Sequence, residues 1–144
     1  MSNLIFKGYV VKESSFILNS SVAKNKQQYV INPKLEFNIN VANDILKVLA
    51  TVKIENAQDK PTPFDITLKA LSEFKIKNMV NIDLLRIEAC ETFYPFLRSM
   101  IANITVNANM NPYYLPYIDF KKPVESKKDS AIDNIVIRPI DENI

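Results

Sequence analysis

The sequence contains no histidine, and this absence removes the commonest general base and the commonest metal ligand in proteins. Serine–histidine and cysteine–histidine nucleophile pairs are excluded for the same reason. Glycine occurs once, as Gly8, whereas phosphate-cradling loops and dinucleotide fingerprints need several glycines at fixed spacing. A small enzyme built from Lys, Tyr or Asp remains an alternative, but no such constellation stands out. We therefore expect a protein that is not an enzyme and needs no metal or cofactor.

Cysteine also occurs once, so Cys90 can form no internal disulfide, and a lone cysteine is most often a small core residue. No stretch stays apolar over the roughly eighteen residues that a membrane-spanning helix needs. The first residues lack the basic flank and apolar run of a signal peptide, so a cytoplasmic location without membrane insertion is expected. The 18 basic and 16 acidic residues are mixed along the chain, which disfavours nucleic-acid binding.

The length of 144 residues suits one domain, and four segments alternate apolar and polar residues with the period of half-buried strands. In the clearest segment, Leu35, Phe37, Ile39 and Val41 share one face. Gly8 interrupts the first segment, where it indicates a bulge or a close approach. The short link at 42–44 predicts an antiparallel hairpin between the second and third strands. The four predicted strands cover residues 4–17, 34–41, 45–55 and 64–76.

The spacing of apolar residues becomes helical from Ile82 onward. We expect a short helix over 82–91 and a longer one over 93–106, with Thr92 as the N-cap of the second. Pro95 would then lie in a first turn, where proline is tolerated because the N–H groups there lack intrahelical partners. Strands followed by helices predict an α+β fold, with the long helix covering part of the sheet.

Seven of the fourteen aromatic residues lie between Phe93 and Phe120. Tyrosine offers a large area with a wettable tip, and methionine is flexible, so together they can form an adaptable apolar surface. The predicted wall of a binding groove consists of Met110, Tyr113, Tyr114 and Tyr117, with Tyr29 from the segment between the first two strands. The alternative is that these rings cap the core or bury a subunit interface.

The order of the elements and two motifs resemble the SecB protein-export chaperones. In "FYPFLRSMIANITVNANMNPYYLPYIDF", the matching residues are Tyr94-Pro95-Phe96, Arg98, Pro112, Leu115, Pro116 and Phe120. In "YVVKESSFI", they are Lys12, Glu13, Ser15 and Phe16. We expect residues 1–120 to form a SecB-like chaperone domain and residues 121–144 a charged tail, in which "NIVIRPI" predicts a short edge strand.

The resemblance implies an ATP-independent holdase that binds unfolded polypeptides or preproteins for export. It also implies a four-stranded antiparallel sheet followed by a long packed helix, and a homotetramer built as a dimer of dimers. Apolar residues opposite the main core parity support an oligomer, since monomers rarely expose large apolar patches; these are Ile5, Tyr9, Val11, Leu49 and Leu71. The expected client-binding groove contains Tyr29, Met100, Ile104, Met110, Tyr113, Tyr114, Leu115 and Tyr117.

The sequence departs from the resemblance in charge, because its net charge is +2 whereas these chaperones are usually strongly acidic. Glu13 matches the surface that docks the basic tail of a SecA-type export motor, but Ile17 and Thr67 stand where carboxylates are common. A helix expected after the aromatic stretch is also missing. We therefore predict weak docking to the motor. The alternative function is a dedicated chaperone or adaptor for one partner, such as an antitoxin.

Overall fold

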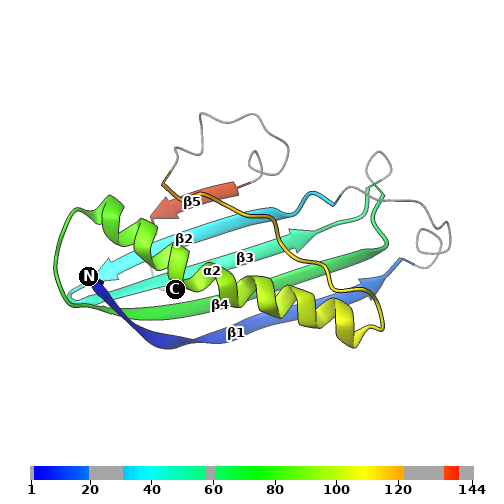
Figure 1. Ribbon diagram of the computed structural model, residues 1–144, viewed down its shortest axis with the longest axis horizontal. Coiled ribbons are helices and arrows are strands. Elements are labelled where there is room, and N and C mark those ends of the chain that lie inside the picture. The colour runs from blue at the N-terminus through cyan, green and yellow to red at the C-terminus, as the bar shows by residue number, and fades with distance from the viewer. Residues whose placement is uncertain (1, 20–30, 58–60, 122–134, 140–144) are drawn as a thin grey trace.

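A computed structural model of the chain describes residues 2–19, 31–57, 61–121 and 135–139. The strands form one sheet in the order β1-β4-β3-β2-β5 (Figure 1). The first four strands are antiparallel, and β5 pairs parallel with β2 at the edge. This confirms the predicted α+β fold of a four-stranded antiparallel sheet followed by one long helix. The elements are β1 (Leu4–Leu18), β2 (Lys34–Ala42), β3 (Ile45–Ile54), β4 (Phe64–Ile76), α2 (Ile82–Asn107) and β5 (Ile135–Pro139).

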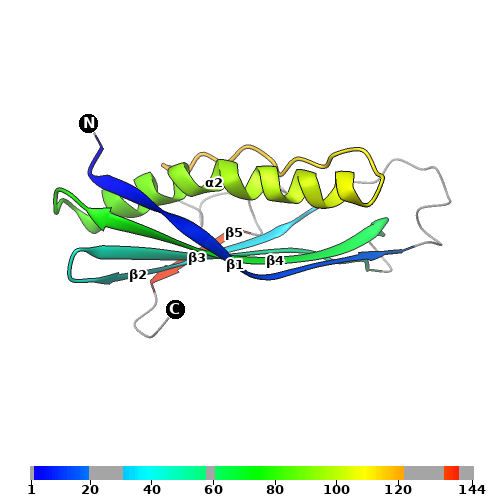
Figure 2. The ribbon, with the colours of Figure 1, turned by 90° about the horizontal axis from the view of Figure 1, so that it is seen from below.

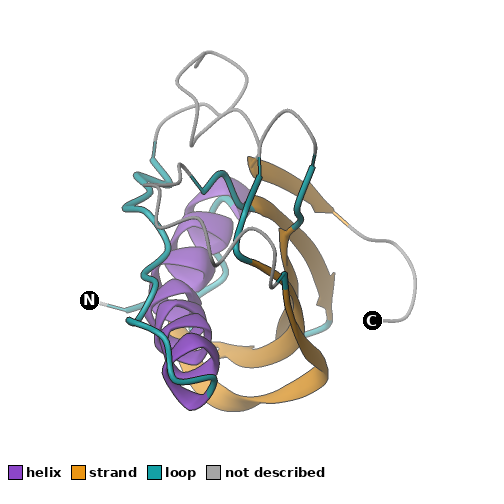
Figure 3. Cartoon of the chain, turned by 90° about the vertical axis from the view of Figure 1, so that its right-hand side faces the viewer, coloured by secondary structure: helices purple, strands orange, loops and turns teal. Residues whose placement is uncertain are grey.

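The helix α2 lies across one face of the curved sheet, so the molecule has two layers (Figures 2 and 3). Every second residue of β4 from Phe64 to Ile76 is buried, and β3 shows the same alternation from Leu46 to Ile54. These buried residues face α2. Their neighbours point to the outer face of the sheet and are half-buried, except Lys53 and Lys75, which are exposed. One covered face and one open face are typical of an antiparallel sheet.

The predicted hairpin joins β2 to β3 through a two-residue turn. Ala42 pairs with Ile45, so Asn43 and Asp44 form the turn. Asn43 has a φ of 58°, in the left-handed region that asparagine tolerates better than most residues. A positive φ at the first turn residue matches the right-handed twist of the two strands.

Two irregularities in β1 change which of its side chains face α2. The register against β4 shifts between Phe6 and Gly8, where Gly8 has a φ of 128°, and again between Val11 and Glu13. As a result Tyr9 pairs with Ser72 and Val11 with Ala70, both buried partners on the helix side. The expectation that Tyr9 and Val11 lie opposite the core parity is therefore wrong. The bulge at Gly8 was predicted, but its effect on parity was not. One extra residue reverses the side chains that follow it, until the second irregularity after Val11 restores the original parity.

The two predicted helices are one continuous helix, α2, that passes through Pro95. Its N-cap is Asn81, whose side chain accepts a hydrogen bond from the N–H of Asp83 at 2.7 Å, and not Thr92. An interior proline costs about 3 kcal/mol. Removing one large core side chain costs about 2–5 kcal/mol, so keeping the whole apolar face in one register outweighs the proline. That buried face repeats every four residues: Leu85, Ala89, Phe93, Leu97, Ile101 and Thr105.

The helix ends by turning the chain back on itself. Asn109 has a φ of 63°, its N–H donates to the carbonyl of Val106, and the N–H of Met110 donates to the carbonyl of Thr105. This pair of bonds around a left-handed residue is a Schellman ending, which satisfies the last carbonyls of a helix. The reversal sends the following residues back along α2.

Candidate functional site

Residues 110–120, here called the aromatic loop, run back along α2 in the opposite direction to the helix (Figure 1). Three side chains of α2 hold the backbone of this loop at successive points. The bonds are Tyr113 N–H to Thr105 Oγ1 (3.0 Å), Arg98 Nε–H to Leu115 O (3.0 Å) and Tyr94 O–H to Pro116 O (2.5 Å). A loop of this length would otherwise lose much conformational freedom on binding a ligand. The helix therefore fixes the course of the loop in advance.

The inner side of the aromatic loop belongs to the hydrophobic core. Leu115 is only 1% exposed, and the buried ring of Phe120 lies 5.5 Å from the rings of both Phe37 and Tyr94. Tyr113 is half-buried against Phe64, with the ring centroids 6.4 Å apart. Burial raises the pKa of Tyr113 to about 12, so its hydroxyl stays neutral at physiological pH. Leu115 therefore supports the loop from below and offers little surface to a ligand.

The outer side of the loop presents two tyrosines to solvent. Tyr114 is 59% exposed and Tyr117 is 80% exposed. Exposed rings keep a large apolar area in contact with water unless a partner covers them. Tyrosine is enriched at protein interfaces because binding removes that area from water. The loop thus combines a backbone fixed by α2 with two protruding aromatic side chains.

The other predicted groove residues lie close to the loop or outside the described part of the chain. Met100 and Ile104 belong to the stretch of α2 beside which the loop runs, and both are half-buried against the core, as is Met110. Tyr29 lies outside the described residues. The helix side chains that contact the loop are Tyr94, Arg98 and Thr105. Met100 lies one turn after Phe96, on the flank of α2 that faces β1.

Glu13, the residue expected to dock a basic partner, is on the outer face of the sheet. Its carboxylate lies 3.7 Å from Nζ of Lys69, with both side chains about half exposed. Lys69 belongs to the neighbouring strand and is the register partner of Glu13. An exposed pair of this kind is weak, but it reduces the negative field that Glu13 offers to a basic partner.

A second aromatic surface, which the sequence reasoning missed, lies between β1 and α2. Phe96 stacks on Phe6 at 5.2 Å and contacts Tyr9 at 5.5 Å, and both Phe96 and Tyr9 remain exposed. We call Phe6, Tyr9 and Phe96 the aromatic seam. The signal that could have revealed it is the bulge at Gly8, because the reversed parity is what brings Tyr9 onto the helix side.

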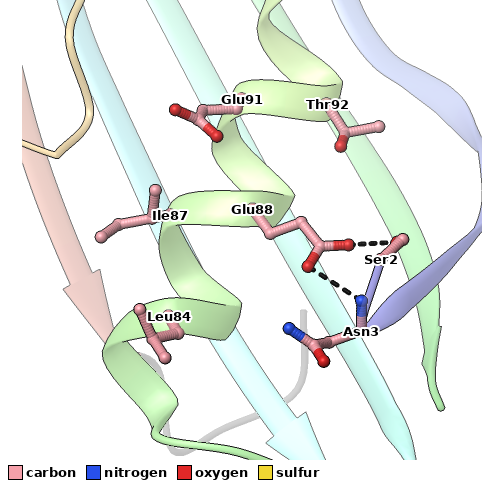
Figure 4. A pocket seen from close by; sticks show the side chains of 7 residues that line it. All are labelled: Ser2, Asn3, Leu84, Ile87, Glu88, Glu91 and Thr92. Carbon is pink, nitrogen blue, oxygen red and sulfur yellow. Dashed lines mark hydrogen bonds between the residues drawn. The ribbon is translucent and has the colours of Figure 1, made fainter. Parts of the chain in front are cut away.

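The N-terminal half of α2 carries an open pocket of about 470 Å³ against the start of β1 (Figure 4). Within it, the carboxylate of Glu88 accepts hydrogen bonds from the N–H groups of Asn3 and Leu4 at 3.0 and 3.1 Å, and from the hydroxyl of Ser2. Burial raises the pKa of Glu88, but these bonds lower it by more, so the pKa lies below its ordinary value. This carboxylate is used to hold the start of β1. The lining residues are Ser2, Asn3, Leu84, Ile87, Glu88, Glu91 and Thr92.

The described residues offer no arrangement suited to metal binding, since no three His, Cys, Asp or Glu side chains gather among them. Cys90 is buried, and this burial raises the pKa of its thiol to about 12, which leaves it protonated and unreactive. In the described part of the chain, no helix is both long and apolar enough to cross a membrane.

The molecule is a sheet covered on one face by a single long helix, with an anchored loop that presents aromatic rings. Comparison with known families identifies this arrangement. The family described as "Preprotein translocase subunit SecB" matches residues 2–130, and the chain belongs to the SecB family. Members of this family are non-enzymatic chaperones, and this membership supports a chaperone role for the protein.

Individual relatives show how far the chain has diverged. It is 31% identical over 121 residues to the protein-export protein SecB of Neorickettsia sennetsu, covering 76% of this chain and 74% of that one. An uncharacterized protein of Methanocaldococcus jannaschii is 27% identical over 123 residues, covering 81% and 79%. Among solved structures, a SecB-like chaperone of Mycobacterium tuberculosis, in complex with a peptide from the HigA1 antitoxin, superposes with a TM-score of 0.59. That structure is 10% identical and covers 84% of this chain and 93% of its own, so it supports the shared fold.

Proposed function

We propose that the protein is an ATP-independent holdase that binds unfolded polypeptides, including preproteins, through the outer side of the aromatic loop. The observation that carries this proposal is the exposure of Tyr114 and Tyr117 on a backbone fixed by α2. Pre-organised rings lose little entropy on binding, and an aromatic contact does not depend on the exact sequence of the client. Met100, Ile104, Met110 and Tyr29 are the further residues that we propose for the client-binding surface.

The test is to replace Tyr114 and Tyr117 together with serine. Each exposed aromatic anchor contributes on the order of 1 kcal/mol, so affinity for a reduced, denatured polypeptide should fall about tenfold or more. Tyr113 is left intact, because its N–H and ring hold the loop in place. The matched control is Met79→Ser, which removes a side chain 65% exposed elsewhere on the surface. Equal affinity of the tyrosine variant and the control, in fluorescence titrations, would contradict the proposal.

The proposed holdase needs no cofactor and acts in the cytoplasm without inserting into a membrane. Its breadth of clients separates it from a second candidate, a dedicated chaperone for one partner such as an antitoxin. The pairing of Glu13 with Lys69 favours this second candidate, because it weakens the surface expected to dock a SecA-type motor. Suppression of aggregation of several unrelated denatured proteins without nucleotide would support the general holdase. Activity towards one partner alone would support the dedicated chaperone.

We also propose that the protein forms a homotetramer, as a dimer of dimers. Apolar side chains remain exposed on both faces of β1, with Tyr9 and Val11 on the helix side and Ile5, Val10 and Ile17 on the outer face. Such a surface on an edge strand tends to be covered by another chain. Sedimentation at micromolar concentration should give the mass of the tetramer, and Tyr9→Glu should reduce that mass. A monomeric wild-type protein would contradict this assembly.

A further inference from the structure

The edge of the sheet at β2 is occupied by a distant segment of the same chain. Residues Ile135–Pro139 pair in parallel with β2 over five positions, from Leu35 with Ile135 to Ile39 with Pro139. This segment follows the aromatic loop in sequence and lies beside β2 at the outer edge of the sheet (Figure 1). Among the described strands it is the one parallel pairing in an otherwise antiparallel sheet.

Several features make β5 a weak occupant of this edge. Parallel pairing is slightly less stable per residue than antiparallel pairing, and β5, with five residues, is the shortest of the described strands. Its last residue is Pro139, which has no N–H to donate. The segment nevertheless has an advantage, because it belongs to the same chain and so is present at high effective concentration. A free peptide that pairs better could replace it.

The edge also adjoins the proposed client surface. Phe37, in the middle of β2, contacts the ring of Phe120 at 5.5 Å, and its register partner in β5 is Ile137. Exposed Tyr117 lies three residues before Phe120, so at most about 10 Å of chain separates them. A client segment that contacts Tyr117 can therefore continue onto the β2 edge.

We propose that the β2 edge binds an extended client segment by strand addition, and that β5 is its built-in competitor. This inference rests on the proposed holdase function and adds a second attachment, made by main-chain hydrogen bonds. Such bonds do not depend on the side chains of the ligand, which suits a protein that binds many unfolded sequences. Because a client must displace β5, the stability of the pairing between β5 and β2 sets the affinity for the client. If β5 is docked nine-tenths of the time, it weakens client affinity about tenfold.

The test replaces Val136 and Ile137 together with proline in the full-length protein. Neighbouring strand residues direct their N–H groups to opposite edges, so the double change removes the N–H that faces β2 whichever residue provides it. The matched control is Val136→Thr with Ile137→Thr, which keeps both N–H groups and a high strand propensity. Circular dichroism and the unfolding midpoint establish that the proline variant keeps the rest of the fold.

The probe is a fluorescent peptide of sequence KVTVYVTVK, compared with the same peptide N-methylated at its three central residues. The methylated peptide keeps every side chain but cannot add as a strand. We expect the proline variant to bind the unmodified peptide about three- to tenfold more tightly than the threonine control, and the methylated peptide no more tightly. Unchanged or weaker binding of the unmodified peptide would overturn the inference, as would an equal gain for both peptides.

The inference and the holdase proposal fail in different ways. If wild-type protein binds the peptide and loses binding when Tyr114 and Tyr117 become serine, but the proline variant behaves like its control, the holdase survives and the competitor role of β5 is wrong. If no variant binds either peptide or suppresses aggregation, both proposals are wrong.

Discussion

The two halves of α2 each hold another segment of the chain, but they do so by different means. In the N-terminal half, the partly exposed carboxylate of Glu88 accepts hydrogen bonds from the start of β1. From the middle of the helix onward, Tyr94 and Arg98 donate to loop carbonyls, and the loop itself inserts Leu115 into the core. The first attachment depends on a titratable carboxylate, whereas the second depends on carbonyl acceptors that do not titrate.

The second attachment explains how the protein can expose aromatic side chains on a loop whose backbone stays fixed. Burial of apolar area is the larger stabilising contribution, at about 25 cal/mol per Å² removed from water. The aromatic loop is therefore part of the fold itself, and the exposure of Tyr114 and Tyr117 does not require a mobile backbone. The start of β1 also inserts a side chain, Leu4, into the core, so Glu88 adds charged hydrogen bonds to a segment that apolar burial already holds.

The largest expected effect comes from removing the side chain that the loop inserts into the core. Leu115→Ala should lower the free energy of unfolding by about 2–5 kcal/mol, since it deletes a fully buried side chain and leaves a cavity. The matched control is Tyr117→Ala in the same loop, which should change stability by no more than about 0.5 kcal/mol. Urea denaturation measures both. Similar losses for the two variants would show that the loop has no inner and outer side.

The sequence predicted that the residues of this loop contribute to a binding surface. It could not show which of them face the core and which face solvent. Alternation in β3 and β4 and the turn at Asn43 are local patterns, so the sheet and its hairpin followed from them. The inward direction of Leu115 and the outward direction of Tyr114 depend on three hydrogen bonds from a helix lying earlier in sequence. Tertiary contacts of that kind leave no periodic signal within a short loop.

The sequence-based predictions that proved wrong can be traced to particular residues. The predicted helix boundary at Thr92 places Pro95 in a first turn, where proline is tolerated, yet the four-residue repeat of buried side chains continues across both residues. Attention to that repeat from Leu85 to Thr105 would have given one helix. The aromatic seam was missed because a period-two reading of β1 does not allow for a bulge, and one bulge moved Tyr9 to the other face. β5 pairs with residues one hundred positions earlier in the chain, and sequence pattern alone does not specify such a register.

A smaller effect is expected from removing one hydrogen bond of the loop while keeping the ring that makes it. Tyr94→Phe leaves the ring contacts with Phe37 and Phe120 but deletes the bond to the carbonyl of Pro116. We expect a loss of about 1–2 kcal/mol, since the part-buried carbonyl then lacks this donor. The loss should appear in urea denaturation and be accompanied by faster proteolysis within the loop. A variant as stable as the wild type would mean that burial alone holds the loop.

The smallest effect is expected at the ionic attachment, and its dependence on pH distinguishes it from the other two. The pKa of Glu88 in the folded protein lies below its ordinary value of 4.5, so the folded state favours the charged carboxylate. A carboxyl group with a lowered pKa contributes stability above its unfolded pKa, and that stability is lost as the pH falls through the folded value. Glu88→Gln should therefore destabilise the protein at pH 7, by no more than about 1 kcal/mol because the group is partly exposed.

Below the ordinary pKa of 4.5 this contribution declines, so the difference between wild type and Glu88→Gln should shrink towards zero as the pH falls through the lowered pKa of the folded protein. Glu91→Gln is the matched control, because Glu91 lines the same pocket and makes none of the three bonds to the start of β1. Hydrogen exchange at the amides of Asn3 and Leu4 gives a local readout, and it should speed up in Glu88→Gln at neutral pH and not in the control. A difference in stability that stays constant from pH 7 to pH 3 would contradict the hypothesis that the charge of Glu88 stabilises the start of β1. It would mean that the two halves of α2 hold their segments by the same kind of interaction.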